Sequence, residues 1–280
     1  MEYCRYRIEY KSRSDVFKLY CLGDIHAGVV YCAEKRLKAK INQIKDDPFA
    51  LFVGMGDYCD CITPHDKRFD TSGLADWVKK DNIIESQRRW IVDILNPIRH
   101  KCIGLLEGNH EVSIRLFHSD DIYSNICDDL GVTPLGYSCF LDLIFIRNPQ
   151  NAGRDVTRFR GRLEHGSGWA QTDGAKLNRL KKGLRGFDAD FYAMGHLHDI
   201  KVDVSSPLLT VNRAGKIVSK VRVAAMTGCW FKTYEQGQRP SYGEQRGFDP
   251  TPIGCPVFLM RPDTQQIEVL GGDELLKKTS

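Results

Sequence analysis

The stretch LLEGNHEVS, residues 105–113, changes from apolar to polar within a few positions. Its leucines end an apolar run that is typical of a buried strand, and Asn109 and His110 follow almost at once. A strand that ends in an amide and an imidazole presents both groups at the edge of a sheet. The fold and the chemistry of the chain therefore depend on which other side chains meet Asn109 and His110 there.

The composition is that of an ordinary globular chain, with 280 residues, 42% of them hydrophobic and 27% charged. We interpret residues 1–280 as a single domain. The net charge of +4 permits anionic substrates without requiring them. The N-terminal residues contain no apolar signal segment, and no apolar run reaches the roughly 18 to 20 residues of a membrane span. We expect a cytoplasmic protein without membrane contact, and the sequence does not predict its oligomeric state.

The ten cysteines are scattered and form no CxxC pair. In a chain without a signal peptide, this arrangement is typical of free thiols in a reducing compartment. A zinc ribbon needs paired spacings that are absent here.

The first half of the chain alternates strands with helices, which indicates a parallel sheet covered by helices. We expect strands at 16–23, 49–58 and 101–108, and helices at 33–45 and 81–99, the second with Asp81 as its N-cap. The second half is mostly strands, at 139–147, 156–166, 191–196, 255–260 and 265–272, with a helix at 173–185 and a hairpin at 201–226 that turns at Arg213 to Lys216. These elements predict an α/β fold with four layers, in which helices flank two mixed sheets.

Each of the first three strands is followed by residues with metal-binding chemistry. Asp24 and His26 follow the first strand, Asp57 follows the second, and Asn109 and His110 follow the third. Because the carboxyl ends of parallel strands share one edge of a sheet, these side chains are expected to converge.

Two later strands end in the same way, with His165 after one and the pair His196 and His198 after the other. On an extended segment, an HxH pair directs both imidazoles to one side. A single motif of this kind is usually an ordinary turn, but five in order, each closing an apolar strand, indicate a metal site. Mixed oxygen and nitrogen ligands suit Mn, with Fe, Zn or Co as alternatives, and seven ligands are enough for two divalent ions about 3.5 to 4 Å apart.

In this order the motifs resemble those of the calcineurin-like metallophosphoesterase superfamily, as found in bacteria and their phages. The family pattern is DxH, GDxxD, GNH[DE], H and GHxH, and it stands here at 24–26, 56–60, 108–111, 165 and 195–198. The match runs from about residue 17 to residue 200. It departs from the family only at His165, which stands in EHGSG rather than in a GH-type motif.

The resemblance implies a role for each motif residue. One metal ion would be held by Asp24, His26, Asp57 and His198. The second would be held by Asp57, Asn109, His165 and His196, with Asp57 as the bridge. His110 would lie above the phosphate as the catalytic residue that protonates the leaving group or stabilises the transition state.

The substrate is less defined. A phosphodiesterase or nuclease that acts on nucleic acid is favoured, because GDxxD with Asp60 is similar to the pattern of nucleases and other phosphodiesterases in the superfamily. Glu107 stands where protein Ser/Thr phosphatases have arginine. The alternatives are a phosphomonoesterase of a small metabolite or nucleotide, and a binding module without activity. We predict that Asp60, His65 and Arg68 contact the substrate.

Three further features bear on the substrate. A basic segment contains Arg154, Arg158, Arg160 and Arg162, and a basic helix face follows at 173–185; each is either a solvated surface or a track for phosphates. Trp77, Trp169 and Trp230 are either core residues or stacking platforms for bases. The loops at 62–80 and 235–254 are long enough to cover the site.

Overall fold

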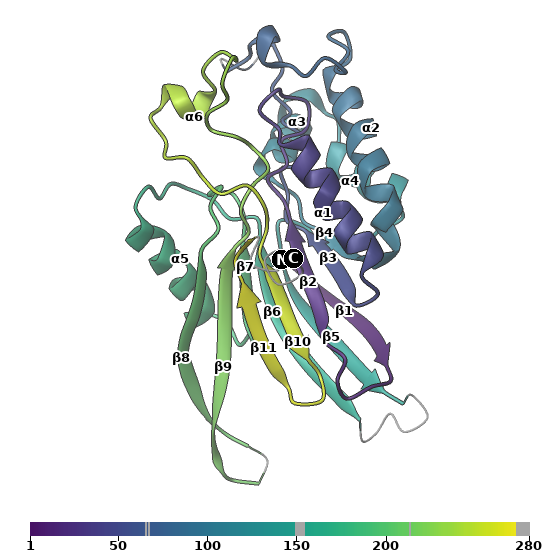
Figure 1. Cartoon of the computed structure of the whole chain (residues 1–280), viewed down its shortest axis with the longest axis vertical. Helices are drawn as coiled ribbons and strands as arrows, with labels where there is room; N and C mark the ends of the chain where they lie inside the picture. The colour runs from purple at the N-terminus through teal and green to yellow at the C-terminus, as the bar shows by residue number, and fades with distance from the viewer. Residues whose placement is uncertain (65, 67, 149–154, 213, 273–280) are drawn as a thin grey trace.

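Two β-sheets pack face to face, and helices cover their outer faces (Figure 1). The computed structural model describes residues 1–64, 66, 68–148, 155–212 and 214–272. The strand orders are β1-β5-β6-β7-β9-β8 in the six-stranded sheet and β11-β10-β2-β3-β4 in the five-stranded sheet. Both sheets mix parallel and antiparallel pairs, so the predicted four-layer α/β sandwich is confirmed.

The five-stranded sheet carries the first three motifs. Its strands are β2 (Phe17–Leu22), β3 (Ala50–Gly54) and β4 (Cys102–Leu105), which run parallel, and β10 (Val257–Arg261) and β11 (Gln266–Leu270), which are antiparallel additions. Its outer face packs on residues of α1 (Glu34–Asp46), α2 (Ile83–Leu95), α3 (Asn109–His118) and α4 (Ile122–Leu130). The parallel strands bring the residues that follow them to one end of the sandwich.

The six-stranded sheet carries the other two motifs. Its strands are β1 (Glu2–Tyr10), β5 (Ser138–Arg147), β6 (Val156–Glu164), β7 (Phe191–Met194), β8 (Val202–Val211) and β9 (Ile217–Met226). On its outer face, α5 (Asp173–Arg185) packs Leu180 and Leu184 against Tyr192 and Met194. Because β6 and β7 are parallel neighbours, they end side by side.

The side chains of β2 that face the core between the sheets are all apolar. Phe17, Leu19 and Cys21 face the other sheet, whereas Tyr20 and Leu22 face the helices. A parallel strand that is buried on both faces exposes few side chains to water, so its residues are mostly apolar. This explains the apolar run at residues 16–23.

Several elements differ from the sequence-based expectations. The charged N-terminal segment is strand β1, whose exposed residues alternate with the buried Ile8 and Tyr10. Helix α2 is capped at Asn82 rather than at Asp81, and it ends at Leu95 because the 3₁₀ turn that follows contains proline. Neither α3 nor α4 was predicted.

Other predictions hold closely or lie outside the described residues. Helix α5 has the predicted bounds, and the hairpin β8–β9 closes where Asn212 donates to and accepts from the turn. Arg213, Arg154 and His65 lie outside the described residues. Among the described residues, every helix is too short or too polar to cross a bilayer. The single-domain boundary at 1–280 stays a prediction.

Candidate metal centre

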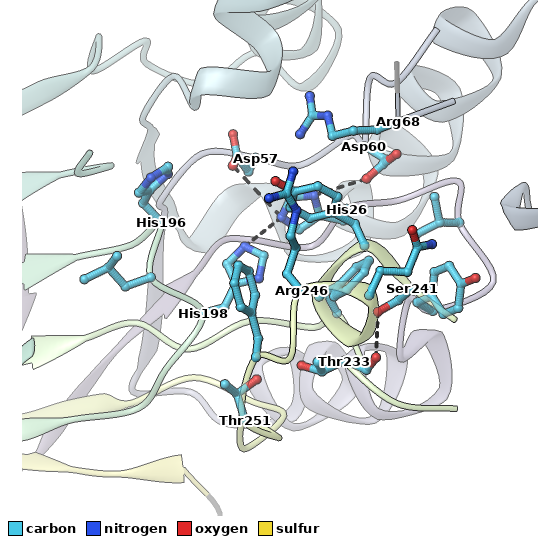
Figure 2. Close-up of a pocket in the computed structure, with 18 of the residues that line it drawn as sticks. His26, Asp57, Asp60, Arg68, His196, His198, Thr233, Ser241, Arg246 and Thr251 are labelled. Atoms are coloured by element: carbon cyan, nitrogen blue, oxygen red, sulfur yellow. Dashed lines mark hydrogen bonds and ion pairs between the residues drawn. The ribbon is translucent and has the colours of Figure 1, made fainter. Parts of the chain in front are cut away.

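The strand-end residues of both sheets meet at one end of the sandwich. Asp24, Asp57 and Asn109 follow β2, β3 and β4, and His165 and His196 follow β6 and β7 from the other sheet. Four groups among the described side chains have ligand atoms within 4.8 Å of one another, and two of these groups together contain six of the seven predicted metal ligands. The centre therefore lies on the seam between the two sheets (Figure 2).

One group consists of Asp24, His26 and His198. The Nε2 atoms of His26 and His198 lie 3.0 Å apart, and Nε2 of His198 lies 3.3 Å from Oδ1 of Asp24. Oδ2 of Asp57 lies 4.0 Å from Nε2 of His26. These donor atoms face a common space, as the ligands of one ion must.

The other group consists of Asp57, His165 and His196. Nε2 of His165 lies 3.3 Å from Oδ2 of Asp57. The Asn109 Oδ1 atom faces both imidazoles, 3.0 Å from Nε2 of His165 and 2.7 Å from Nδ1 of His196. All seven predicted ligands thus converge, and Asp57 lies between the two groups, where a bridging carboxylate is needed.

The backbone around these residues is strained. Five candidate ligands have positive φ angles near 50° to 69°, a region that non-glycine residues rarely adopt: Asp24, His26, Asp57, His196 and His198. Gly108 permits the closest approach, because a Cβ atom there would lie 2.1 Å from the Asp57 nitrogen. Strain of this kind costs about 1 to 3 kcal/mol per residue and persists at functional sites.

Glu111 is a site residue that the sequence reasoning did not identify. Its carboxylate is buried and accepts four backbone N–H bonds, from Gly108, Asp57, Tyr58 and Cys59. It therefore ties the turn after β3 to the start of α3. The signal in the sequence was the capping-box spacing of GNHE, in which the glutamate occupies the third position of the helix.

The electrostatics of the centre favour a cation between the carboxylates. Burial opposes ionisation of Asp57, but His165 and His110 hold its pKa well below the ordinary range. Burial lowers the pKa of His165, but the charges on Asp57 and Asp24 outweigh it and raise that pKa to about 10. For His26 burial dominates and lowers the pKa, which favours the neutral imidazole that binds metal. The buried carboxylates and imidazoles present could bind metal.

Contacts with residues outside the predicted ligand set orient the imidazoles of two candidate ligands. Nδ1 of His165 donates to the Met55 carbonyl at 2.7 Å, which leaves Nε2 free for an ion. Nδ1 of His26 lies 3.4 Å from the Asp60 carboxylate, which has the same effect. Asp60 thus supports a candidate ligand, and its contact with substrate stays a prediction.

His110 lies in the first turn of α3 beside Asp57 and is not among the seven predicted ligands. Its Nδ1 atom bonds the Asp60 carbonyl, and its Nε2 atom lies 4.0 Å from Oδ2 of Asp57. Burial lowers the pKa of His110, but the charges on Asp57 and Asp60 outweigh it and raise the pKa. The ring is therefore fixed with one nitrogen toward the metal ligands and favours the protonated form that an acid catalyst needs.

A cavity of about 1050 Å³ opens above the centre. The loop after the second motif lines one side and contributes Arg68, which pairs with Asp66 at 2.7 Å. Residues 235–254, here called the roof segment, also line the cavity and contain the short helix α6 (Tyr242–Gln245), whose Tyr242 ring lies 6.0 Å from the Arg68 guanidinium. Figure 2 shows Arg68 and Arg246 on the walls of the pocket that holds His26. A role for Arg68 in substrate binding stays a prediction.

The basic segment before His165 is mostly neutralised. Arg158 and Arg160 pair with the buried Asp142, at 3.7 and 2.8 Å, and Arg162 pairs with Glu164 at 3.0 Å. These contacts favour the solvated-surface interpretation of this segment over a phosphate track.

The tryptophans differ from one another. Trp230 is buried, and Trp77 stacks on Trp90 with ring centroids 5.3 Å apart. Trp169 is 58% exposed and lines the cavity. It is therefore the one predicted stacking residue that lies beside the site in the described part of the chain.

The five motifs that resemble those of the calcineurin-like metallophosphoesterases thus lie together at one end of the sandwich, with Asp57 close to both groups of candidate ligands.

No protein-family model and no curated protein matches the chain. Among solved structures it is similar to a metallophosphoesterase from Sphaerobacter thermophilus, with 12% identity over 92% of this chain and 89% of that one, and a TM-score of 0.39. It is also similar to Vps29 from Entamoeba histolytica complexed with zinc (10% identity, 91% and 98% covered, TM-score 0.36). A nuclease from Pseudomonas putida has 12% identity, 90% and 87% covered, and a TM-score of 0.31. We derive no activity from similarities of this size.

Proposed function

We propose that the protein is a metal-dependent phosphodiesterase that cleaves nucleic acid. The observation that carries the proposal is the convergence of seven candidate ligands, with Asp57 close to both groups that the others form, at the bottom of a cavity with His110 beside it. When bound, two divalent ions supply a nucleophilic water near neutral pH and neutralise charge on the phosphoryl oxygens.

The residues of the chain have separate tasks in this reaction. The strained strand-end turns hold the ligands in place before substrate arrives, so that little reorganisation is needed during the reaction. His110, with Nδ1 fixed by the Asp60 carbonyl, holds a proton on Nε2 toward the leaving oxygen. Glu111 keeps the turn that carries Asp57 against the start of α3.

The size of the cavity supports a diester over a small monoester. Pockets for small molecules measure about 300 to 1,000 Å³, and this one reaches about 1050 Å³. A diester has a substituent on each side of the phosphorus and needs room on both sides of the centre. A cavity of this volume, lined by the loop after the second motif and by the roof segment, is large enough for both substituents.

A side-by-side assay with manganese tests the proposal. The substrates are p-nitrophenyl phosphate, bis-p-nitrophenyl phosphate, single- and double-stranded DNA, and RNA. We expect cleavage of the bis ester and of a polynucleotide, with loss of both in EDTA and return when manganese is restored. Cleavage of the monoester alone would identify the alternative, a phosphomonoesterase of a small metabolite or nucleotide.

A further inference from the structure

One wall of the cavity is aromatic and comes from two segments that the motifs do not include. The Trp169 and Phe248 rings contact edge to face with centroids 4.9 Å apart, and Phe248 contacts Tyr242 at 6.2 Å. All three line the cavity, and Trp169 is 58% exposed and Tyr242 is 42% exposed. Large aromatic side chains left open inside a cavity are typical of a binding surface.

The Trp169 loop is held in position rather than left free. The Arg179 side chain, from α5, donates to the carbonyls of Ser167 and Trp169, the second at 3.3 Å. Trp169 is four residues beyond the candidate ligand His165, so chain length alone limits their Cα separation to about 14 Å. The ring therefore has a fixed place beside the metal centre.

The roof segment is fixed in a similar way. Oγ of Ser241 is buried, donates to the Thr233 carbonyl at 2.6 Å and accepts from the Glu244 nitrogen (Figure 2). The Tyr234 hydroxyl donates to the Phe248 carbonyl at 2.8 Å. These bonds hold the segment that places the Phe248 ring against Trp169.

The same wall carries positive charge. The Arg246 guanidinium lies 5.3 Å from the Tyr242 ring centroid, and Arg68 lies 6.0 Å from it. Arg68 is paired with Asp66, whereas no carboxylate of the described residues lies within 4.0 Å of Arg246. A ring surface next to an unpaired guanidinium matches a base joined to a phosphate.

We propose that Trp169, Tyr242 and Phe248 form a subsite for the nucleobase adjacent to the scissile phosphate, with Arg246 beside the neighbouring phosphate. The subsite requires an unstacked base, because a duplex covers the faces of its bases. The substrate class is therefore single-stranded nucleic acid or a nucleotide ester. This inference rests on the proposed phosphodiesterase activity, which it makes more specific.

A pair of esters with the same leaving group tests the subsite. Thymidine 5′-(p-nitrophenyl phosphate) carries a base and methyl p-nitrophenyl phosphate carries none. We expect Trp169→Ala to raise KM for the thymidine ester about tenfold, since stacking on one base is worth on the order of 1 to 3 kcal/mol. The kcat value for the thymidine ester and the kinetics with the methyl ester should change little. Trp169→Phe keeps an aromatic ring, so KM for the thymidine ester should stay close to that of the parent.

The matched control is Phe117→Ala, which truncates another exposed aromatic residue, on α3 and outside the cavity lining. It should leave both esters unchanged. An equal effect of Trp169→Ala on both esters, or no effect on either, would overturn the subsite.

Binding separates this inference from the proposed activity. Fluorescence anisotropy in EDTA compares labelled single-stranded oligothymidylate with an abasic oligomer of equal length. If oligothymidylate binds more tightly than the abasic oligomer and Trp169→Ala reduces this binding, the subsite is supported even when neither ester is hydrolysed. A lack of hydrolysis would then contradict the proposed phosphodiesterase activity and not the subsite. Equal binding of the two oligomers, together with no effect of Trp169→Ala on the thymidine ester, would reject the base subsite. If the substrate is a nucleotide ester, Trp169→Ala should still raise KM for the thymidine ester. The oligomer should then bind no more tightly than the thymidine ester does.

Discussion

The metal centre and the roof segment line the same cavity but are built in opposite ways. The candidate ligands of the centre follow five strands, five of the seven lie in strained backbone, and most are buried. The roof segment is held by side-chain-to-backbone bonds that join it to Thr233 and Tyr234, and it leaves Tyr242 and Arg246 open to solvent. We therefore propose that the centre carries out the reaction and that the roof selects the ester. Changes in the centre should lower kcat, and changes in the roof should raise KM.

Asp57→Asn should give the largest effect, because this carboxylate lies between both groups of ligands. We expect hydrolysis of bis-p-nitrophenyl phosphate to fall by about 10³-fold or more. Metal content measured by mass spectrometry should fall as well. Asp93→Asn, an exposed change on α2, is the matched control and should bind metal as the parent does. If Asp57→Asn kept full metal content and full activity, Asp57 would not be a metal ligand.

His110→Ala should lower kcat by about 10² to 10⁴, the usual contribution of a general acid. Metal content should stay unchanged, because His110 is not one of the seven candidate ligands. The exposed His100→Ala provides the control for loss of an imidazole. If metal content fell together with activity, His110 would be a ligand rather than an acid, and the comparison between catalytic and binding residues would need revision.

The centre could be predicted from the sequence because its residues must follow strands. A buried parallel strand has to be apolar, so the first polar residues after β2, β3 and β4 stand out, and the sheet brings them to one edge. The two-sheet fold followed from the same alternation. Strand β1 did not, because its outward side is charged and only Ile8 and Tyr10 are buried.

The roof could be predicted only as a long loop near the site. Its contacts join residues far apart in the chain, such as Trp169 with Phe248, and no local periodicity records such pairs. The same limit applies to Glu111, whose four backbone partners become visible only when the turn after β3 meets α3. The pairing of Arg158 and Arg160 with Asp142 likewise needed the β5–β6 register.

Glu111→Gln tests whether the centre depends on this hidden support. The glutamate has two carboxylate oxygens that accept bonds from four backbone N–H groups, whereas a glutamine side chain has only one accepting oxygen. Some of these buried N–H groups would therefore lose their partners in the variant. We expect a loss of about 2 kcal/mol in the free energy of unfolding, measured with urea, together with weaker metal binding. The exposed Glu9→Gln on β1 is the control and should change neither. An unchanged stability would mean that the strained turns hold their shape without Glu111.

Arg246→Gln should give the smallest effect, because the guanidinium is exposed and solvent screens its charge. We expect KM for a single-stranded oligonucleotide to rise about threefold at low salt, with kcat unchanged, and the difference to shrink as salt increases. Arg246→Lys should keep most of the charge effect and lose the contact with the Tyr242 ring. Arg7→Gln, an exposed change on β1, removes the same charge away from the cavity and should leave KM unchanged. A fall in kcat with constant KM would place Arg246 with the catalytic residues instead, and the division between the centre and the roof would then be wrong.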